Sequence, residues 1–398
     1  MNEPKANAAA TGAGRIPNRE GTRRDGGAYR PEPLAGTGHR RNNFDVVRLA
    51  AAVSVVFSHS FLIAEGSEAN EPFVRLTGNQ CVLGLVGVFV FFIISGYLVT
   101  DSWCRHPASV GFALRRGLRI FPGLLANGLV CAFVLGPWAT TLPLGTYLAS
   151  PETRGFLLKI ATLYPGPLQL PGVLFADNSV GLLVNGSLWT LRYEAMMYAM
   201  VLLLGLAGLL RSSRTGLWCS VMLAGIGIAA VYFEKYLGPF GDFGEWAWLV
   251  GFFASGMCLY FLRNRLVLDG RIALLALLAL VLFTWLGRLI MLFPLAGAFL
   301  VIWFARRYDR ALDYSRFTGD LSYGIYIYGW PAEEGVMYAS GDTAAWWQIF
   351  LFGLGVTVAL AWLSWHLVEK RALRWGRRIT AAGSAAPVAA RPLAPAED

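Results

Sequence analysis

The chain has 398 residues, of which 56% are hydrophobic and 15% are charged, and its formal net charge is +9. Soluble domains carry about 25% charged residues, so this composition excludes an ordinary soluble protein and indicates a membrane protein. The positive charge follows short connections between apolar segments and not one basic domain, which argues against nucleic-acid binding.

The two ends of the chain differ in composition from the rest. Residues 1–42 are rich in Gly, Ala, Pro and Arg and show no apolar period, so we predict a disordered cytoplasmic tail. The first apolar segment begins only near Val46, too far along for a signal peptide, and we expect it to remain as a membrane anchor. Residues 379–398 are a second predicted tail, which leaves 43–378 as the transmembrane domain.

The apolar segments between the tails predict an all-α, polytopic bundle of about ten helices, because a span needs about 17 to 25 residues. Those spans are expected at 45–63, 81–100, 121–138, 188–210, 217–233, 246–262, 271–286, 289–305, 321–339 and 345–367. The seventh and eighth are separated only by Gly287 and Arg288, which fits either a tight hairpin or one kinked element.

The distribution of basic residues predicts the orientation of the bundle. Successive connections between spans must lie on alternate sides of the membrane. Counted in this way, twenty Lys and Arg residues lie on one side and five on the other. The positive-inside rule then places both termini in the cytoplasm. The longest connection, 139–186, falls outside and holds an apolar piece at 156–163 that is too short to span.

Cysteine and histidine patterns give no metal or disulfide framework. The five cysteines form no CxxC pair, and the four histidines form no HxxxH or HExxH arrangement. We therefore expect no metal, and we look for function among ionisable side chains inside the apolar spans, where they are costly unless they serve a purpose.

Arg48 and His59 occupy the first span. They are eleven residues apart, which puts them on one helix face about 16 Å apart along the axis. A neutral imidazole is a workable general base, while a histidine hydrogen-bonded between helices is an equally good interpretation from position alone. For Arg48 the simpler interpretation is a side chain that extends into the headgroup region.

The fourth span carries Arg192 and Glu194, with Tyr198 one turn later. Glu194 and His59 are both expected about 10 Å below the outer face of the membrane. A His59–Glu194 pair, in which the carboxylate orients the imidazole, is therefore predicted. The alternative is a structural ion pair of Glu194 with Arg192 or Arg48.

The ninth span contains aromatic residues, a proline and two acids. Pro331 is expected to break the helix and free backbone carbonyls near Glu333 and Glu334. Trp330 and Glu333, together with Trp189 and Tyr198 of the fourth span, are candidates for contact with substrate. Any single aromatic residue also fits the interfacial belt of a membrane protein.

The connection 105–122 combines Arg115, Arg116 and Arg119 in an amphipathic stretch beside the membrane. Arginine binds phosphate bidentately, so these residues are candidates for a phosphate-bearing ligand. Such clusters also arise from the positive-inside rule or from contact with anionic lipid.

Taken together, several segments resemble the integral-membrane acyltransferase family 3. These segments cover most of the chain, and their order and spacing make the resemblance specific. The matching segments are NFDVVR at 43–48 with His59, FFIISGY at 91–97, RGLRIFP at 116–122, SLWTLRYE at 187–194 with Tyr198, LSYGIY at 321–326 with Trp330 and Pro331, and VEK at 368–370.

This resemblance implies specific roles. Members of the family acylate extracytoplasmic carbohydrates, His59 matches the family's essential first-helix histidine, and Arg48 matches its partner arginine. Arg116 and Arg119 match an R-x-x-R motif near the cytoplasmic entrance for acyl-CoA, and Glu194 falls in a functional polar site. Glu333, Glu334 and Arg371 depart from the family pattern.

On this basis we expect an inner-membrane O-acyltransferase that transfers an acetyl group from cytoplasmic acyl-CoA to an extracytoplasmic glycan. His59 would act as general base, either in direct transfer or through an acyl-enzyme. A non-enzymatic transporter of lipid-linked sugar or an acidic solute is the alternative, and a sensor or scaffold subunit is a third. The sequence sets no oligomeric state.

Overall fold

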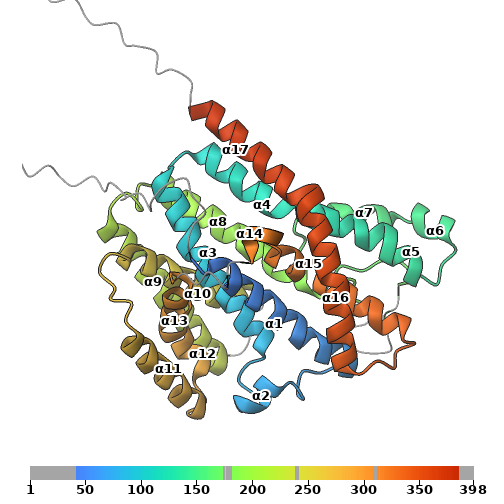
Figure 1. The fold of residues 1–398 in the computed structure, drawn as a ribbon, viewed down its shortest axis with the longest axis horizontal. Coiled ribbons are helices and arrows are strands. Elements are labelled where there is room, and N and C mark those ends of the chain that lie inside the picture. Colours follow the sequence, from blue (N-terminus) through green and yellow to red (C-terminus); the bar gives the residue numbers. More distant parts are fainter. Residues whose placement is uncertain are drawn as a thin grey trace, which may run out of the picture.

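The computed structural model describes residues 42–173, 175, 182–237, 242–307, 312 and 314–384. Every regular element in these ranges is helical (Figure 1), which confirms the all-α prediction for this part of the chain. The predicted tails lie outside the described residues, except that the last helix continues to Ser384.

In chain order the helices are α1 (Phe44–Glu65), α2 (Pro72–Leu76), α3 (Leu83–Arg105), α4 (Ser109–Val130), η1 (Cys131–Leu135), α5 (Gly136–Ala139), α6 (Leu144–Ala149), α7 (Pro151–Ala161), η2 (Gly186–Leu188), α8 (Trp189–Leu206), α9 (Ser213–Leu237), α10 (Asp242–Leu262), α11 (Gly270–Trp285), α12 (Leu289–Leu292), η3 (Phe293–Gly297), α13 (Ala298–Ala305), α14 (Ser315–Thr318), α15 (Ser322–Ala339), α16 (Trp346–Ser364), η5 (Trp365–Glu369) and α17 (Lys370–Ser384).

Each predicted span coincides with helix in the structure. Five stretches of the described chain are long and apolar enough to cross a membrane: Phe44–Glu65, Leu83–Arg105, Ser109–Ala139, Ser213–Ala230 and Trp346–Thr380. Three other predicted spans are shorter apolar helices: Trp246–Leu262, Gly270–Trp285 and Leu289–Ala305. The remaining two are α8 and α15, whose acidic and aromatic side chains lower their mean hydropathy.

Helix α1 lies at the centre of the molecule and packs against α3, α15 and α16 (Figure 1). Helix α10 joins this core to α9, and its backbone approaches that of α3 very closely. A β-carbon at Gly96 would lie 1.9 Å from the Phe253 carbonyl oxygen, and one at Gly256 would lie 2.0 Å from that of Ile93. Small residues allow such contacts between membrane helices.

The segment 270–305 is a hairpin, which decides between the two arrangements left open by the sequence. Helix α11 ends at Trp285, and the chain turns through Gly287, whose φ of +71° lies in the left-handed region that glycine tolerates best. Helices α12 and α13, joined by the π-helical turn η3, then pack back against α11.

The helix expected at 121–138 is much longer in the structure. Ser109–Ala139 is one continuous helix made of α4, η1 and α5, so the predicted loop that carries the three arginines is helical over most of its length. The connection after Ala139 contains two helices, α6 and α7, and α7 includes part of the apolar piece at 156–163.

The expected helix break at Pro331 does not occur, because α15 continues through this residue to Ala339. Pro331 cannot donate a hydrogen bond to the carbonyl of Ile327, four residues earlier. That carbonyl instead accepts hydrogen bonds from Asn127 Nδ2 at 2.9 Å and from Asn185 Nδ2 at 2.8 Å. Side chains of α4 and of the segment before α8 therefore replace the lost backbone bond, and the helix continues through Pro331.

Asn185→Ala should lower the free energy of unfolding by about 2 kcal/mol, because the Ile327 carbonyl loses a buried partner. The substitution also removes the bond from Ser187 N to Asn185 Oδ1 and the bond from Asn185 Nδ2 to Asn127 Oδ1. Thermal or denaturant unfolding in detergent measures the loss. Asn70→Ala, in an exposed loop, is the control and should change stability by less than about 0.5 kcal/mol; equal stability of the two variants would contradict this explanation.

Candidate functional site

A cavity of about 630 Å³ opens among α1, α3, α4, α8, α15 and α17. Its size suits a small-molecule ligand. Arginines dominate its charged lining, which also includes the acids Asp101 and Glu194. The arginines that line it are Arg48, Arg105, Arg115, Arg116, Arg119 and Arg377.

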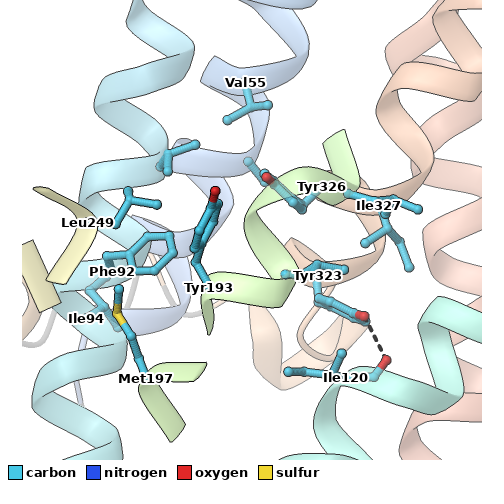
Figure 2. Close-up of a cluster of buried hydrophobic side chains, with 14 of the residues drawn as sticks. Val55, Phe92, Ile94, Ile120, Tyr193, Met197, Leu249, Tyr323, Tyr326 and Ile327 are labelled. Carbon is cyan, nitrogen blue, oxygen red and sulfur yellow. Dashed lines mark hydrogen bonds between the residues drawn. The ribbon is translucent and has the colours of Figure 1, made fainter. Parts of the chain in front are cut away.

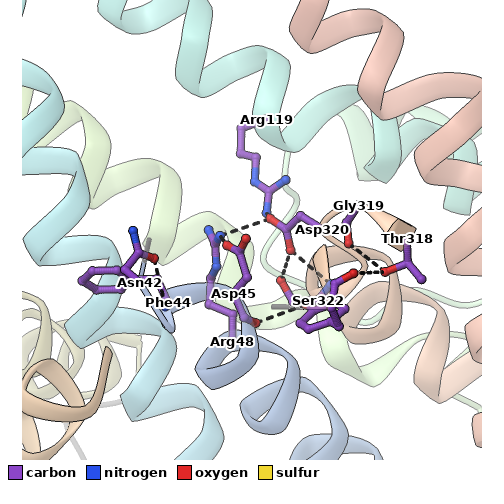
Figure 3. Close-up of polar contacts among 10 residues, drawn as sticks. Asn42, Phe44, Asp45, Arg48, Arg119, Thr318, Gly319, Asp320 and Ser322 are labelled. Atoms are coloured by element: carbon purple, nitrogen blue, oxygen red, sulfur yellow. Dashed lines mark hydrogen bonds and ion pairs between the residues drawn. The ribbon is translucent and has the colours of Figure 1, made fainter. Parts of the chain in front are cut away.

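Asp320, in the loop before α15, joins two of these arginines (Figure 3). One of its carboxylate oxygens lies 2.6 Å from Arg119 Nη2 and 3.3 Å from Arg48 Nη2. Its other oxygen accepts a hydrogen bond from Ser322 Oγ at 2.6 Å. Burial alone would raise the pKa of Asp320, but the two guanidinium groups outweigh burial and hold that pKa below its usual range.

Arg48 also pairs with Asp45, one turn earlier in α1. The structural ion pair of Arg48 with Glu194, considered from the sequence, is replaced by these contacts with Asp45 and Asp320. Asp320 connects α1, α4 and α15 at one point, and it was not among the residues predicted from the sequence. Its position just before the LSYGIY segment was the available signal.

Glu194 and Tyr198 lie side by side on α8 in the wall of the cavity. The Tyr198 hydroxyl donates a hydrogen bond to Glu194 Oε1. The guanidinium carbon of Arg116 lies 5.6 Å from the centre of the Tyr198 ring and 5.9 Å from that of Phe112. Both distances permit cation–π attraction. Glu194, Tyr198 and Arg116 therefore form one polar wall.

Tyr326 lines the inner end of the cavity, deep in the core (Figure 2). Its hydroxyl donates to the Ser187 carbonyl at 2.8 Å, so Thr190, whose Oγ1 lies 2.5 Å away, acts as donor to Tyr326. One turn earlier in α15, the Tyr323 hydroxyl donates to the Ile120 carbonyl at 2.7 Å. These bonds hold both rings against the cavity.

His59 does not belong to the cavity lining. Its ring packs edge-on against Trp330, with 4.8 Å between ring centres, and Trp330 follows Tyr326 by one turn of α15, about 6 Å. The side chain of His59 is half-buried, and its Nδ1 is buried with no hydrogen-bond partner among the described residues.

The predicted His59–Glu194 hydrogen bond is absent from the described part of the chain, where Glu194 is bonded to Tyr198 instead. The reason is geometric. Glu194 lines the same cavity as Tyr326, whereas His59 lies outside it and contacts Trp330, which follows Tyr326 by one turn of α15.

The other candidate substrate residues lie outside the large cavity: Trp189 is the first residue of α8, and Trp330 and Glu333 are in the second half of α15. Trp330 Nε1 donates to the Leu183 carbonyl at 3.1 Å. Trp189 lines a second, smaller cavity of about 170 Å³, together with Lys159 and Arg192. Glu333 is fully buried against Gly353 of α16, and its carboxylate oxygens have no hydrogen-bond partner among the described residues.

Three guanidinium nitrogen atoms of the cavity lining lack a partner. Arg48 Nε, Arg115 Nη2 and Arg116 Nε are buried and have no hydrogen-bond partner within the described ranges. A buried donor without a partner is costly, so an anion bound beside these atoms would stabilise them. Among the described residues, no group of three His, Cys, Asp or Glu side chains is placed to hold a metal ion.

The fold and the site thus define a helical membrane protein with a cationic internal cavity. The chain belongs to the acyltransferase 3 family, whose model, described as an acyltransferase domain, matches residues 41–366. This match confirms the resemblance seen in the sequence and supports an enzyme that transfers acyl groups.

Two relatives match most of this chain and nearly all of their own length. "Nodulation protein 10" of Rhizobium leguminosarum bv. viciae is 30% identical over 367 residues, which cover 85% of this chain and 94% of the relative. The "O-acetyl transferase" of Shigella phage Sf6 is 28% identical over 344 residues, which cover 84% of this chain and 97% of the relative. No solved structure matches the chain.

Proposed function

We propose that the protein is a multi-pass enzyme of the inner membrane that transfers an acetyl group from acetyl-CoA in the cytoplasm to a hydroxyl of an extracytoplasmic glycan. In this proposal about ten helices span the membrane and both termini are cytoplasmic, as the distribution of Lys and Arg indicates. The family match and the similarity to a phage O-acetyl transferase support acyl transfer to oxygen.

The observation that carries the proposal is the arginine-lined cavity with its unpartnered guanidinium nitrogens. Arg115 and Arg116 are suited to bind the phosphates of a CoA donor, because planar guanidinium groups bind phosphate in two-point contacts. Arg119 and Arg48, held by Asp320, lie further along the same cavity. The uncharged arm of the donor would extend past them, along Glu194 and Tyr198, toward Tyr326.

His59 is the proposed general base. The acceptor hydroxyl loses its proton to an imidazole nitrogen while its oxygen attacks the thioester carbonyl carbon. The C–S bond then breaks, and the CoA thiolate takes the proton from the imidazolium. The products are the acetyl ester and free CoA. Because His59 does not line the cavity, side chains between the cavity and the Trp330–His59 contact must move before the thioester reaches the imidazole.

The acceptor is proposed to approach from the opposite side of His59. Trp330 contacts the imidazole directly, which supports its assignment to the acceptor side of the base. Its ring is only 3% exposed, so it would pack against a sugar face only after the neighbouring segment at Gly186 moves away. Trp189 and Glu333 are the other candidate contacts for the acceptor. The phage relative, an O-acetyl transferase, is similar along nearly its whole length, which supports an oxygen atom of the acceptor as the site of acetylation.

Membranes that contain the protein should move label from [acetyl-¹⁴C]acetyl-CoA to the surface polysaccharide of the host. Mass spectrometry of that polysaccharide from cells with and without the protein should show loss of one acetyl increment per modified unit. Membranes from cells without the protein are the control. If glycan crosses vesicles unmodified and no label moves, the protein is a transporter and the proposal is wrong.

A further inference from the structure

The cytoplasmic end of the cavity is completed by a helix outside the family match. The family model ends at residue 366, whereas α17 spans Lys370–Ser384. Leu373, Gly376 and Arg377 of α17 line the cavity. The segment that follows the family domain therefore contributes part of the donor site.

Close packing against α4 fixes the position of α17. A β-carbon at Gly376 would lie 2.5 Å from Leu118 Cδ1, so the backbone of α17 rests directly on α4 at this point. One turn later, a methyl carbon of Thr380 lies near Gly111 at the start of α4. These contacts hold α17 along α4, and Arg377 of α17 lines the same cavity as Arg115 and Arg116 of α4.

The arginines of this cavity fall into two groups. Arg48, Arg105 and Arg119 are neutralised by the carboxylates of Asp45, Asp101 and Asp320. Arg115, Arg116 and Arg377 form no ion pair with a carboxylate among the described residues. Within the part of the chain that the structure describes, Arg116 faces Glu194 and Tyr198 without an ion pair, whereas Arg115 and Arg377 lie on α4 and α17. The positive charge without a bonded carboxylate is therefore shared by α4 and α17, and this end of the cavity suits the multiply charged part of a donor.

We propose that Arg377 binds a phosphate of the nucleotide portion of the acyl donor, and that α17 makes this protein selective for CoA thioesters over donors without phosphate. Arg377 is a specificity-determining residue in this assignment, because it contacts the end of the donor that does not react. The inference rests on the proposed function, since it assumes a CoA donor in the cavity.

Arg377→Gln tests the assignment, with two donors compared in the same transfer assay. The KM for acetyl-CoA should rise about tenfold, while kcat stays within about twofold, because the lost contact is made equally in the ground and transition states. The KM for S-acetylpantetheine, which lacks phosphates, should not change. Arg378→Gln is the matched control, since Arg378 is exposed and does not line the cavity.

A second measurement keeps this test independent of catalysis. Equilibrium binding of radiolabelled CoA to purified protein in detergent should weaken about tenfold in Arg377→Gln and remain unchanged in Arg378→Gln. Unchanged CoA binding in Arg377→Gln, or equal loss in the two variants, would overturn the role of Arg377. If wild-type protein binds CoA through Arg377 but transfers acetyl from neither donor, the inference stands and the proposed acyl transfer fails.

Discussion

Replacing His59 with glutamine should reduce acetyl transfer by about 10²- to 10⁴-fold, the usual contribution of a positioned general base. The amide of glutamine is similar in polarity to imidazole but cannot accept the hydroxyl proton at neutral pH. Because His59 lies outside the donor cavity, the KM for acetyl-CoA should change little. Initial rates of transfer of labelled acetyl to the glycan measure both quantities.

His366→Gln is the matched control for this experiment, because His366 is also half-buried but lies outside the donor cavity, and its Nδ1 bonds to the backbone carbonyl of Trp362 one turn earlier. It should retain the wild-type rate. A His59→Gln enzyme with unchanged kcat would remove His59 from the reaction and leave its packing against Trp330 as its role.

Asp320→Asn should lower the free energy of unfolding by about 3 kcal/mol, the typical cost of removing one partner of a buried ion pair. The substitution leaves Arg48 and Arg119 close together without the carboxylate that they share. The side chains of these residues are only 15% to 21% exposed, so water compensates poorly for the loss. Thermal unfolding in detergent, followed by circular dichroism, measures the change.

Asp45→Asn is the control, because Asp45 also pairs with Arg48 but its side chain is 36% exposed. It should cost less than about 1 kcal/mol. Equal losses in the two variants would show that the position of the carboxylate between α1, α4 and α15 has no special importance.

The stabilising effect of Asp320 should depend on pH. The pKa of Asp320 is lowered in the folded protein, so its ionisation stabilises the fold at pH values above the unfolded pKa, about 3.9. This contribution is lost as the pH falls through the lower, folded pKa. The stability difference between wild type and Asp320→Asn should therefore be full at neutral pH and shrink in strong acid. A constant difference would contradict the charge-based explanation.

The positions of the helices could be predicted from the sequence because apolar runs of sufficient length must be helical in a membrane. The predicted start of the third span, residue 121, was wrong. Arg115, Arg116 and Arg119 interrupt the apolar pattern, but the helix includes them and begins at Ser109. The break expected at Pro331 was wrong because two asparagines from distant segments satisfy the Ile327 carbonyl. Local sequence contains no information about those partners.

The candidate site was predictable in part for the same reason. Arg48, Glu194 and Tyr198 could be selected because charged and polar side chains inside apolar segments are rare. Arg115, Arg116 and Arg119 could be selected as a basic cluster in the connection 105–122, and the structure brings all six residues to one cavity. Asp320 was missed because it lies in a loop and is paired with Arg119, 201 residues earlier in the chain. Matching depths in the membrane suggested a His59–Glu194 contact, but depth does not fix the direction in which a side chain points.

The π-helical turn η5 between α16 and α17 has a consequence for the angular register of the C-terminal helix. A π turn closes its hydrogen bonds at i→i+5 and thus accommodates one residue more than an α-helical turn. One residue corresponds to about 100° of rotation around the helix axis. The extra residue at Trp365–Glu369 therefore sets which side of α17 faces α4. The direction in which Arg377 leaves the helix axis is thus determined by a π-helical turn that ends eight residues before it.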